Sequence, residues 1–105
     1  MAENLETGSS GEISTEEIVK LKPPQQYKVI LHNDDYTPME FVIEILMVVF
    51  KRDETKATEI MLNVHQKGQG ICGVYTYEIA ESKVMRVQEM ARQYEYPLQA
   101  TLEEE

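Results

Sequence analysis

The chain has 105 residues, 42% of them hydrophobic, and carries a formal net charge of −9. A chain this short allows one small domain with one core. Its negative charge opposes binding to nucleic acid and to anionic membranes, and it favours cationic groups or basic protein surfaces as partners. Cys72 is the only cysteine, which excludes an internal disulfide and fits a reducing compartment.

No apolar run approaches the roughly 20 residues that cross a bilayer, and the first residues lack the positive-then-apolar pattern of a secretory signal. We therefore expect a cytoplasmic protein. A monomer without a cofactor or a bound metal is the simplest expectation.

Residues 1–22 are rich in Glu, Ser, Thr and Gly and contain only scattered aliphatic side chains. Because this composition cannot form a core, it predicts a disordered, acidic N-terminal tail. The paired prolines after Lys22 mark its boundary. We predict one α+β domain over residues 23–105.

Residues 27–31 are predicted to form the first strand of this domain. Residues 39–51 are apolar on nearly every side, which predicts a deeply packed helix. Thr37 is expected to cap this helix in a T-x-x-E capping box with Glu40, with Pro38 at the first helical position.

Asp53 is suited to cap a second helix, and Gly68 can end that helix in a left-handed conformation. The apolar residues of the second helix form one stripe, which consists of Ala57, Ile60, Met61 and Val64. Residues 71–75 are predicted to form a second strand, Thr76 to begin a third helix, and residues 98–102 to form a closing strand. The apolar face of the third helix consists of Ala80, Val84, Val87, Ala91 and Tyr94.

The resulting order is strand, helix, helix, strand, helix, strand. This order predicts an α+β fold in which three helices pack on one face of a small three-stranded sheet. Antiparallel pairing is the expectation, although the pattern alone does not fix it.

Asp34 and Asp35 lie on a short loop between the first strand and the first helix. They are candidates for an acid–base pair with His65, but neighbouring side chains in an extended loop point apart. No nucleophile motif accompanies them, and their spacing does not match a metal site. Cys72 lies inside a strand and is expected to be a buried thiol. An enzyme is therefore not expected.

Asn33, Asp34 and a neutral His65 offer the acceptors that a protonated peptide N-terminus requires, because an ammonium group presents three N–H donors. This hypothesis requires the second helix to lie beside the loop. Apolar side chains of the first two helices would then line a hollow for one large hydrophobic side chain; these are Met39, Val42, Met61 and Val64.

The same residues also allow a plain structural interpretation. The four apolar side chains are spaced like ordinary core residues. His65 is placed to stabilise the end of its helix, and the loop residues 33–35 are common in turns. The pattern leaves both interpretations open.

Four segments resemble the ClpS family of bacterial adaptors for the ATP-dependent Clp protease. They are Lys22-Pro23-Pro24, residues 27–31, the run NDDYTPMEFV at residues 33–42, and residues 70–76. The resemblance extends from about Lys22 to Leu102. It implies a non-enzymatic adaptor that binds proteins whose first residue is Phe, Leu, Trp or Tyr and delivers them to a ClpA-type unfoldase.

By position in the family, Asn33, Asp34 and His65 would hold the α-ammonium group. The pocket for the first side chain would consist of Thr37, Met39, Val42, Met61, Val64 and Leu98. The resemblance implies that Met39 acts as a gate against the β-branched residues Ile and Val, and that Asp35 mainly holds the loop.

The resemblance also implies that the adaptor docks on the N-terminal domain of the unfoldase through Glu78 and Lys83. The tail is implied to reach toward the pore of the unfoldase.

A second hypothesis is a docking module that binds a basic protein surface without recognising protein N-termini. A third is a small hydrolase that uses Asp34 and His65, for which no water- or metal-activating group is found in the sequence.

Overall fold

The computed structural model describes residues 23–105; the predicted tail, residues 1–22, lies outside the described residues. The elements are, in chain order, β2 (Gln26–His32), α2 (Met39–Val48), α3 (Glu54–Lys67), β3 (Gln69–Thr76), α4 (Tyr77–Gln93) and β4 (Gln99–Glu104). This is the predicted order, and the α+β fold is confirmed.

The sheet has the strand order β3-β2-β4, and the central strand β2 runs antiparallel to both neighbours. The expected antiparallel pairing is therefore confirmed. Val29 pairs with Gly73 and Ile30 pairs with Ile71, so Cys72 is an extra residue that forms a β-bulge. Within the described part of the chain, the outer edge of β3 pairs with no other strand.

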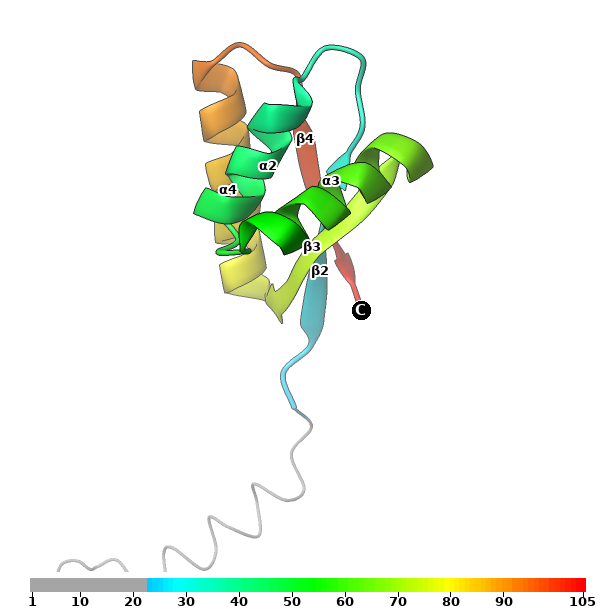
Figure 1. The fold of residues 1–105 in the computed structure, drawn as a ribbon. Helices are drawn as coiled ribbons and strands as arrows, with labels where there is room; N and C mark the ends of the chain where they lie inside the picture. Colours follow the sequence, from blue (N-terminus) through cyan, green and yellow to red (C-terminus); the bar gives the residue numbers. More distant parts are fainter. Residues whose placement is uncertain (1–22) are drawn as a thin grey trace, which may run out of the picture.

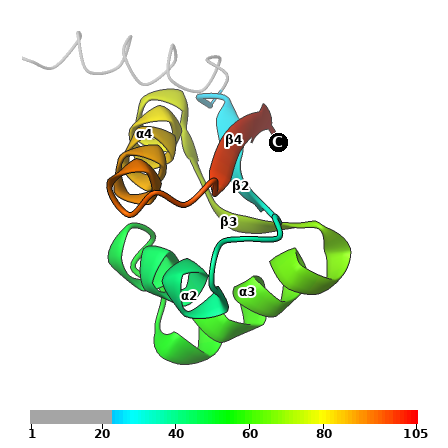
Figure 2. The same ribbon diagram turned by 90° about the horizontal axis from the view of Figure 1, so that it is seen from above.

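The three helices lie on one face of the sheet (Figures 1 and 2). Helix α4 contacts all three strands, α3 packs against β3, and α2 packs against α3. The core lies between these two layers, and its largest fully buried side chains are Leu31, Ile45, Leu46, Val29, Val87 and Cys72. No helix among residues 23–105 is long and apolar enough to cross a membrane.

Helix α3 begins and ends as its sequence predicts. The side chain of Asp53 accepts a hydrogen bond from the backbone N–H of Lys56 at 2.8 Å, which satisfies one free donor of the first turn. Gly68 ends the helix with φ 90°, a left-handed conformation that glycine adopts without steric cost. The predicted stripe is buried along its whole length; it consists of Ala57, Ile60, Met61 and Val64.

The predicted capping box at the start of α2 is wrong. Pro38 is the N-cap residue rather than the first helical residue, and its carbonyl accepts from the N–H groups of Phe41 and Val42. The hydroxyl of Thr37 donates to the carboxylate of Asp34 at 2.8 Å instead of capping the helix. The loop competes with the helix for this hydroxyl, because a charged acceptor makes the stronger hydrogen bond.

Helix α2 also ends earlier than predicted, at Val48 rather than at Lys51. Lys51 adopts a left-handed conformation with φ 57°, and the N–H of Arg52 then donates back to the carbonyl of Leu46. The helix is buried on one side only, where Phe41, Val42, Ile45 and Leu46 face the core. The predicted deep packing therefore holds for this side alone, because Met47 and Val48 are 40% and 41% exposed.

Helix α4 buries Ala80, Val87 and Ala91, which confirms most of its predicted apolar face. Tyr94 follows the helix and is 55% exposed, so its assignment to that face was wrong. Its ring instead packs edge-on against Phe41 at 5.5 Å between centroids.

Candidate functional site

A cavity of about 530 Å³ opens between the loop that follows β2 and the helices α2 and α3. It is lined by Asn33, Asp34, Asp35, Tyr36, Thr37, Pro38, Met39, Val42, Met61 and His65. Polar groups of the loop and of α3 therefore meet apolar side chains of α2 and α3 in one place. This is the arrangement that the sequence hypothesis of an N-terminus site requires.

Backbone contacts bring the loop to the end of α3. The N–H of Asn33 donates to the carbonyl of Gly68 at 2.9 Å, and His32 pairs with Gln69 in the sheet. His65 lies in the last turn of α3, just before Gly68. The turn at Gly68 thus sets the distance between the loop and the imidazole ring.

Asp34 organises the loop. Its Oδ1 atom accepts from the backbone N–H groups of Tyr36 and Thr37 at 2.8 and 2.7 Å, and its Oδ2 atom accepts from the Thr37 hydroxyl at 2.8 Å. Each carboxylate oxygen has two lone pairs, so Oδ1 is fully engaged while Oδ2 can accept one further hydrogen bond. Asp34 can therefore hold the loop and contact a ligand at once.

These contacts also set the charge of Asp34. Burial raises the pKa of its carboxyl group, but the backbone hydrogen bonds from Thr37 and Tyr36 and the Thr37 hydroxyl together outweigh burial. The pKa therefore lies below the ordinary value of 3.8. At neutral pH the carboxylate of Asp34 is therefore fully ionised where it lines the cavity.

Asp35 is exposed and lines the cavity, but its side chain forms no hydrogen bond within residues 23–105. The side-chain hydrogen bonds that hold the loop come from Asp34, so a role of Asp35 in holding the loop stays a prediction. Asp35 adds a second negative charge to the wall of the cavity.

The predicted apolar residues divide into two groups. Val42 and Met61 are buried and line the cavity, while Met39 also lines it and is 45% exposed. Val64 and Leu98 are buried in the core and are not among the cavity residues. A helical stripe identifies the buried side of a helix but does not say which of its residues border a cavity.

Two cavity residues were missed by the sequence reasoning, Tyr36 and Pro38. The side chain of Tyr36 is 79% exposed although its backbone N–H is fixed by Asp34. Both residues belong to the loop that the sequence singled out. The sequence does not show in which direction each side chain of the loop points, so it could not identify these two residues as cavity residues.

The two predicted docking residues have different environments. Glu78 is exposed in the first turn of α4. Lys83 is half-buried: its Nζ atom donates to the carbonyl of Val49 at 2.8 Å and lies 5.6 Å from the ring centroid of Tyr75. Lys83 thus connects α4 to the end of α2, while the side chain of Glu78 forms no hydrogen bond or ion pair within residues 23–105.

The site contains no evident nucleophile or metal centre. Cys72 is buried in β3, and burial raises the pKa of its thiol to about 12, so the thiol stays protonated. Across residues 23–105, no group of three or more His, Cys, Asp or Glu side chains could hold a metal ion.

These features define a small α+β domain with a cavity between a loop and two helices, and both polar and apolar side chains line this cavity. The model of one protein family, "ATP-dependent Clp protease adaptor protein ClpS", matches residues 22–101. The chain therefore belongs to the ClpS family. Its members are adaptors of the Clp protease, and the protein is an adaptor rather than an enzyme.

Curated relatives agree with this family. The ClpS adapter protein of Shewanella piezotolerans is 62% identical over 85 residues, which cover 81% of this chain and 83% of that protein. The ClpS adapter protein of Rhodospirillum centenum is 50% identical over 109 aligned positions, which cover both chains completely.

A solved structure has the same fold. It is that of Agrobacterium tumefaciens ClpS2 bound to L-phenylalaninamide, with a TM-score of 0.77 and 37% sequence identity. The match covers 79% of this chain and all of that chain. The resemblance to the ClpS family, first seen in short sequence segments, is thereby confirmed.

Proposed function

We propose that the cavity binds the free N-terminus of proteins whose first residue is Phe, Leu, Trp or Tyr, and that the protein delivers them to the Clp unfoldase. One observation carries this proposal: acceptors from the loop and from α3 line the same cavity as Val42 and Met61. Neither half of the site would suffice alone, because the ligand combines a charged group with a large apolar one.

The ammonium group of the ligand requires three acceptors. The free lone pair of Asp34 Oδ2 supplies the first, the side-chain carbonyl of Asn33 the second, and a ring nitrogen of His65 the third. Hydrogen bonds between an ammonium and a carboxylate are stronger than neutral ones. Acetylation of the N-terminus removes both the charge and two of the three donors, so it should abolish binding.

The first side chain of the ligand would enter the cavity between α2 and α3. Val42 and Met61, which line the cavity, would form its apolar wall, and Thr37 and Met39, which also line it, would shape its entrance. Burial of one large hydrophobic side chain contributes about 1.5–3 kcal/mol. Met39 would restrict the space near the Cβ atom of the ligand, and this restriction would exclude Ile and Val. Val64 and Leu98 would act from the core rather than by direct contact.

The solved relative supports this assignment. L-phenylalaninamide, the ligand bound to the Agrobacterium protein, has a free α-amine and an amide in place of the next peptide bond. It is therefore a minimal mimic of an N-terminal phenylalanine. The same kind of ligand fits the charge and the apolar lining of the cavity in this chain.

A peptide panel tests the proposal. The protein is titrated with a fluorescent peptide that begins with free Phe, with its N-acetylated twin, and with a version that begins with Ile. We expect binding of the first peptide only. Equal affinity for the acetylated peptide would refute the proposal, and salt-sensitive binding of all three would favour a docking module for basic surfaces. The variant Met39→Ala should bind the Ile peptide as well.

We infer that the N-terminal domain of a ClpA-type unfoldase docks at the start of α4, with Glu78 as a direct contact. Glu78→Lys should impair degradation of a Phe-first substrate while peptide binding and the melting temperature stay unchanged. Lys83→Ala should also lower the melting temperature, because it removes the hydrogen bond to Val49. A normal degradation rate with Glu78→Lys would exclude this docking surface.

Residues 1–22 are proposed to act in delivery rather than in recognition. Deletion of these residues should leave the affinity for a Phe-first peptide unchanged and should slow degradation of the matching protein substrate. Because the unfoldase partner works in the cytoplasm, we assign the adaptor to that compartment, which agrees with its single buried thiol.

A further inference from the structure

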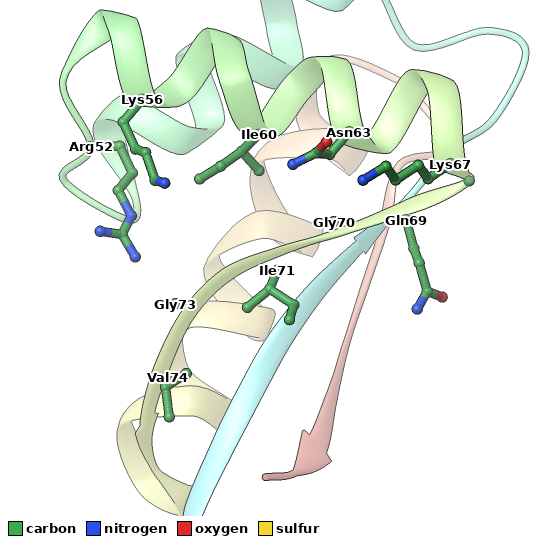
Figure 3. A pocket seen from close by; sticks show the side chains of 11 residues that line it. Arg52, Lys56, Ile60, Asn63, Lys67, Gln69, Gly70, Ile71, Gly73 and Val74 are labelled. Atoms are coloured by element: carbon green, nitrogen blue, oxygen red, sulfur yellow. The ribbon is translucent and has the colours of Figure 1, made fainter.

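A second hollow, distinct from the N-terminus site, lies on the outer side of α3. It is a groove of about 910 Å³ between α3 and β3, and Figure 3 shows the side chains that line it. Lys56, Asn63 and Lys67 come from α3, Arg52 precedes the helix, and Ile71 and Val74 come from β3. Three of its eleven lining residues are cationic and none is acidic.

This concentration of positive charge is unexpected for the chain, which has 10 Lys and Arg residues against 19 Asp and Glu residues. The positive charges are only weakly neutralised. Lys56 forms an ion pair with Glu59 at 3.5 Å, but both side chains are exposed, and such pairs contribute little. Within the described residues, Lys67 forms no ion pair.

Arg52 has a different role in the groove. Its Nε and one terminal nitrogen donate to the carbonyl of Cys72 at 3.0 and 2.7 Å. These hydrogen bonds satisfy the backbone carbonyl of the bulge residue Cys72, and they hold the guanidinium at one end of the groove. The other N–H groups of Arg52 remain available for an anionic partner.

The shape of the groove suits an extended chain. Lys56 and Lys67 are eleven positions apart in α3, or about 16 Å at 1.5 Å per residue. An extended chain covers this distance with about five residues. The floor is the outer edge of β3, which pairs with no strand among residues 23–105, and its Ile71 and Val74 are 50% and 39% exposed. An unpaired strand edge with exposed aliphatic side chains is a surface on which another extended chain can bind.

We propose that this groove binds an extended acidic segment of a partner protein. Its carboxylates pair with Lys56, Lys67 and the free N–H groups of Arg52. Its alternate aliphatic side chains cover Ile71 and Val74, and its backbone lies along the edge of β3. The occupant is not a second copy in the same orientation, because two such grooves would bring like charges together. It is not nucleic acid either, because a polyanion longer than the groove would also meet the negative charge of the rest of the chain, whose net charge is −9.

The probe is a C-terminally labelled, N-acetylated peptide of sequence Glu-Val-Glu-Val-Glu-Val-Glu. Acetylation removes the ammonium group, so binding of this probe is independent of the proposed N-terminus site. Fluorescence anisotropy with the full chain at low salt should show saturable binding. The double variant Lys56→Glu, Lys67→Glu should weaken binding about tenfold or more, because two attractive charge pairs become repulsive. Arg52 stays unchanged in this variant, since it supports β3.

The matched control is Arg86→Glu, Arg92→Glu, which makes the same change of charge on the exposed side of α4. It should bind the probe like the unmodified chain, and both variants should keep the original melting transition. The proposal is overturned if the control weakens binding equally, if a peptide with Lys in place of Glu binds as well, or if the full chain does not bind. Binding that appears only after deletion of residues 1–22 would also overturn it, because the groove would then belong to the chain's own N-terminal segment.

Discussion

Two loops of this domain lead into helices, and each contains an aspartate that accepts backbone N–H groups. Asp53 accepts from Lys56, three positions later, and thereby caps α3. Asp34 accepts from Tyr36 and from Thr37, both of which precede α2. The same kind of side chain thus stabilises a helix in one loop and fixes the shape of the loop that lines the cavity in the other.

The consequence is visible at the start of α2. With Thr37 bound to Asp34, this helix begins at Met39, and its N-cap residue Pro38 provides no side-chain cap. A missing cap costs about 1 kcal/mol relative to a good one. The start of α2 is thus less stable than a capped helix would be, while the carboxylate of Asp34 is held rigidly beside the cavity. We expect such a local cost in stability at a site that binds a ligand.

The largest expected effect is that of Asp34→Ala. This change removes the acceptor of three hydrogen bonds and the negative charge beside the cavity, so we expect affinity for a Phe-first peptide to fall at least about a hundredfold. The domain should lose about 1–2 kcal/mol of unfolding free energy, since water can replace part of these contacts. Peptide titration and chemical denaturation measure the two effects. Unchanged affinity would remove Asp34 from the site.

Asp53→Ala should lower the stability of the fold but, unlike Asp34→Ala, should leave the affinity for the peptide nearly unchanged. Loss of the α3 cap should lower the unfolding free energy by about 1 kcal/mol. Peptide affinity should stay within about twofold of the original value, because the lost cap lies at the opposite end of α3 from His65. A large loss of affinity in this variant would mean that the two loops are coupled and that the comparison between them fails.

The pH dependence of the unfolding free energy tests whether the pKa of Asp34 is lowered in the folded protein. Because its folded pKa lies below the unfolded value of 3.8, the ionised carboxylate stabilises the fold fully above that value. The stabilisation is lost as the pH falls through the folded pKa. The difference in unfolding free energy between the unmodified chain and Asp34→Asn should therefore be constant from about pH 7 to pH 5 and should shrink below about pH 4. A difference that disappears already near neutral pH would contradict the lowered pKa.

Thr37→Val is expected to have the smallest effect. It removes the hydroxyl that donates to Asp34 but leaves the backbone hydrogen bond of the same residue. We expect a loss of about 0.5–1 kcal/mol of unfolding free energy. Thr37→Ser keeps the hydroxyl and is the matched control, which should retain most of the stability. Equal losses in both variants would show that the methyl group, rather than the hydroxyl, matters.

Sequence reasoning succeeded where a structure depends on neighbouring residues. The Asp53 cap, the left-handed Gly68 and the buried stripe of α3 all follow from spacings of a few positions. The prediction that Thr37 caps α2 was wrong. Its hydroxyl could bond either to the start of the helix or to the nearby carboxylate of Asp34, and it donates to the charged acceptor. The sequence also could not separate the roles of Asp34 and Asp35. The conformation of the turn decides where each of these two side chains points, and neighbouring residues alone do not fix that conformation.

Features that depend on tertiary packing were harder to predict. His65 comes to the loop only because β2 and β3 pair beyond the turn at Gly68. Val64 and Leu98 are apolar like the residues that line the cavity, and only their packing assigns them to the core. The basic groove was not foreseen either, although Lys56 and Lys67 occupy one side of α3, because nothing local indicates that β3 is an edge strand.

The most direct measurement is a methyl NMR titration with L-phenylalaninamide and with its N-acetyl derivative. The free amine should shift the methyl signals of Met39 and Met61, which line the cavity, and should leave that of Met85 on the outer side of α4 unchanged. The acetylated compound should shift none of them at the same concentration. Equal shifts with both compounds, or shifts at Met85 alone, would contradict an N-terminus site between the loop and the two helices.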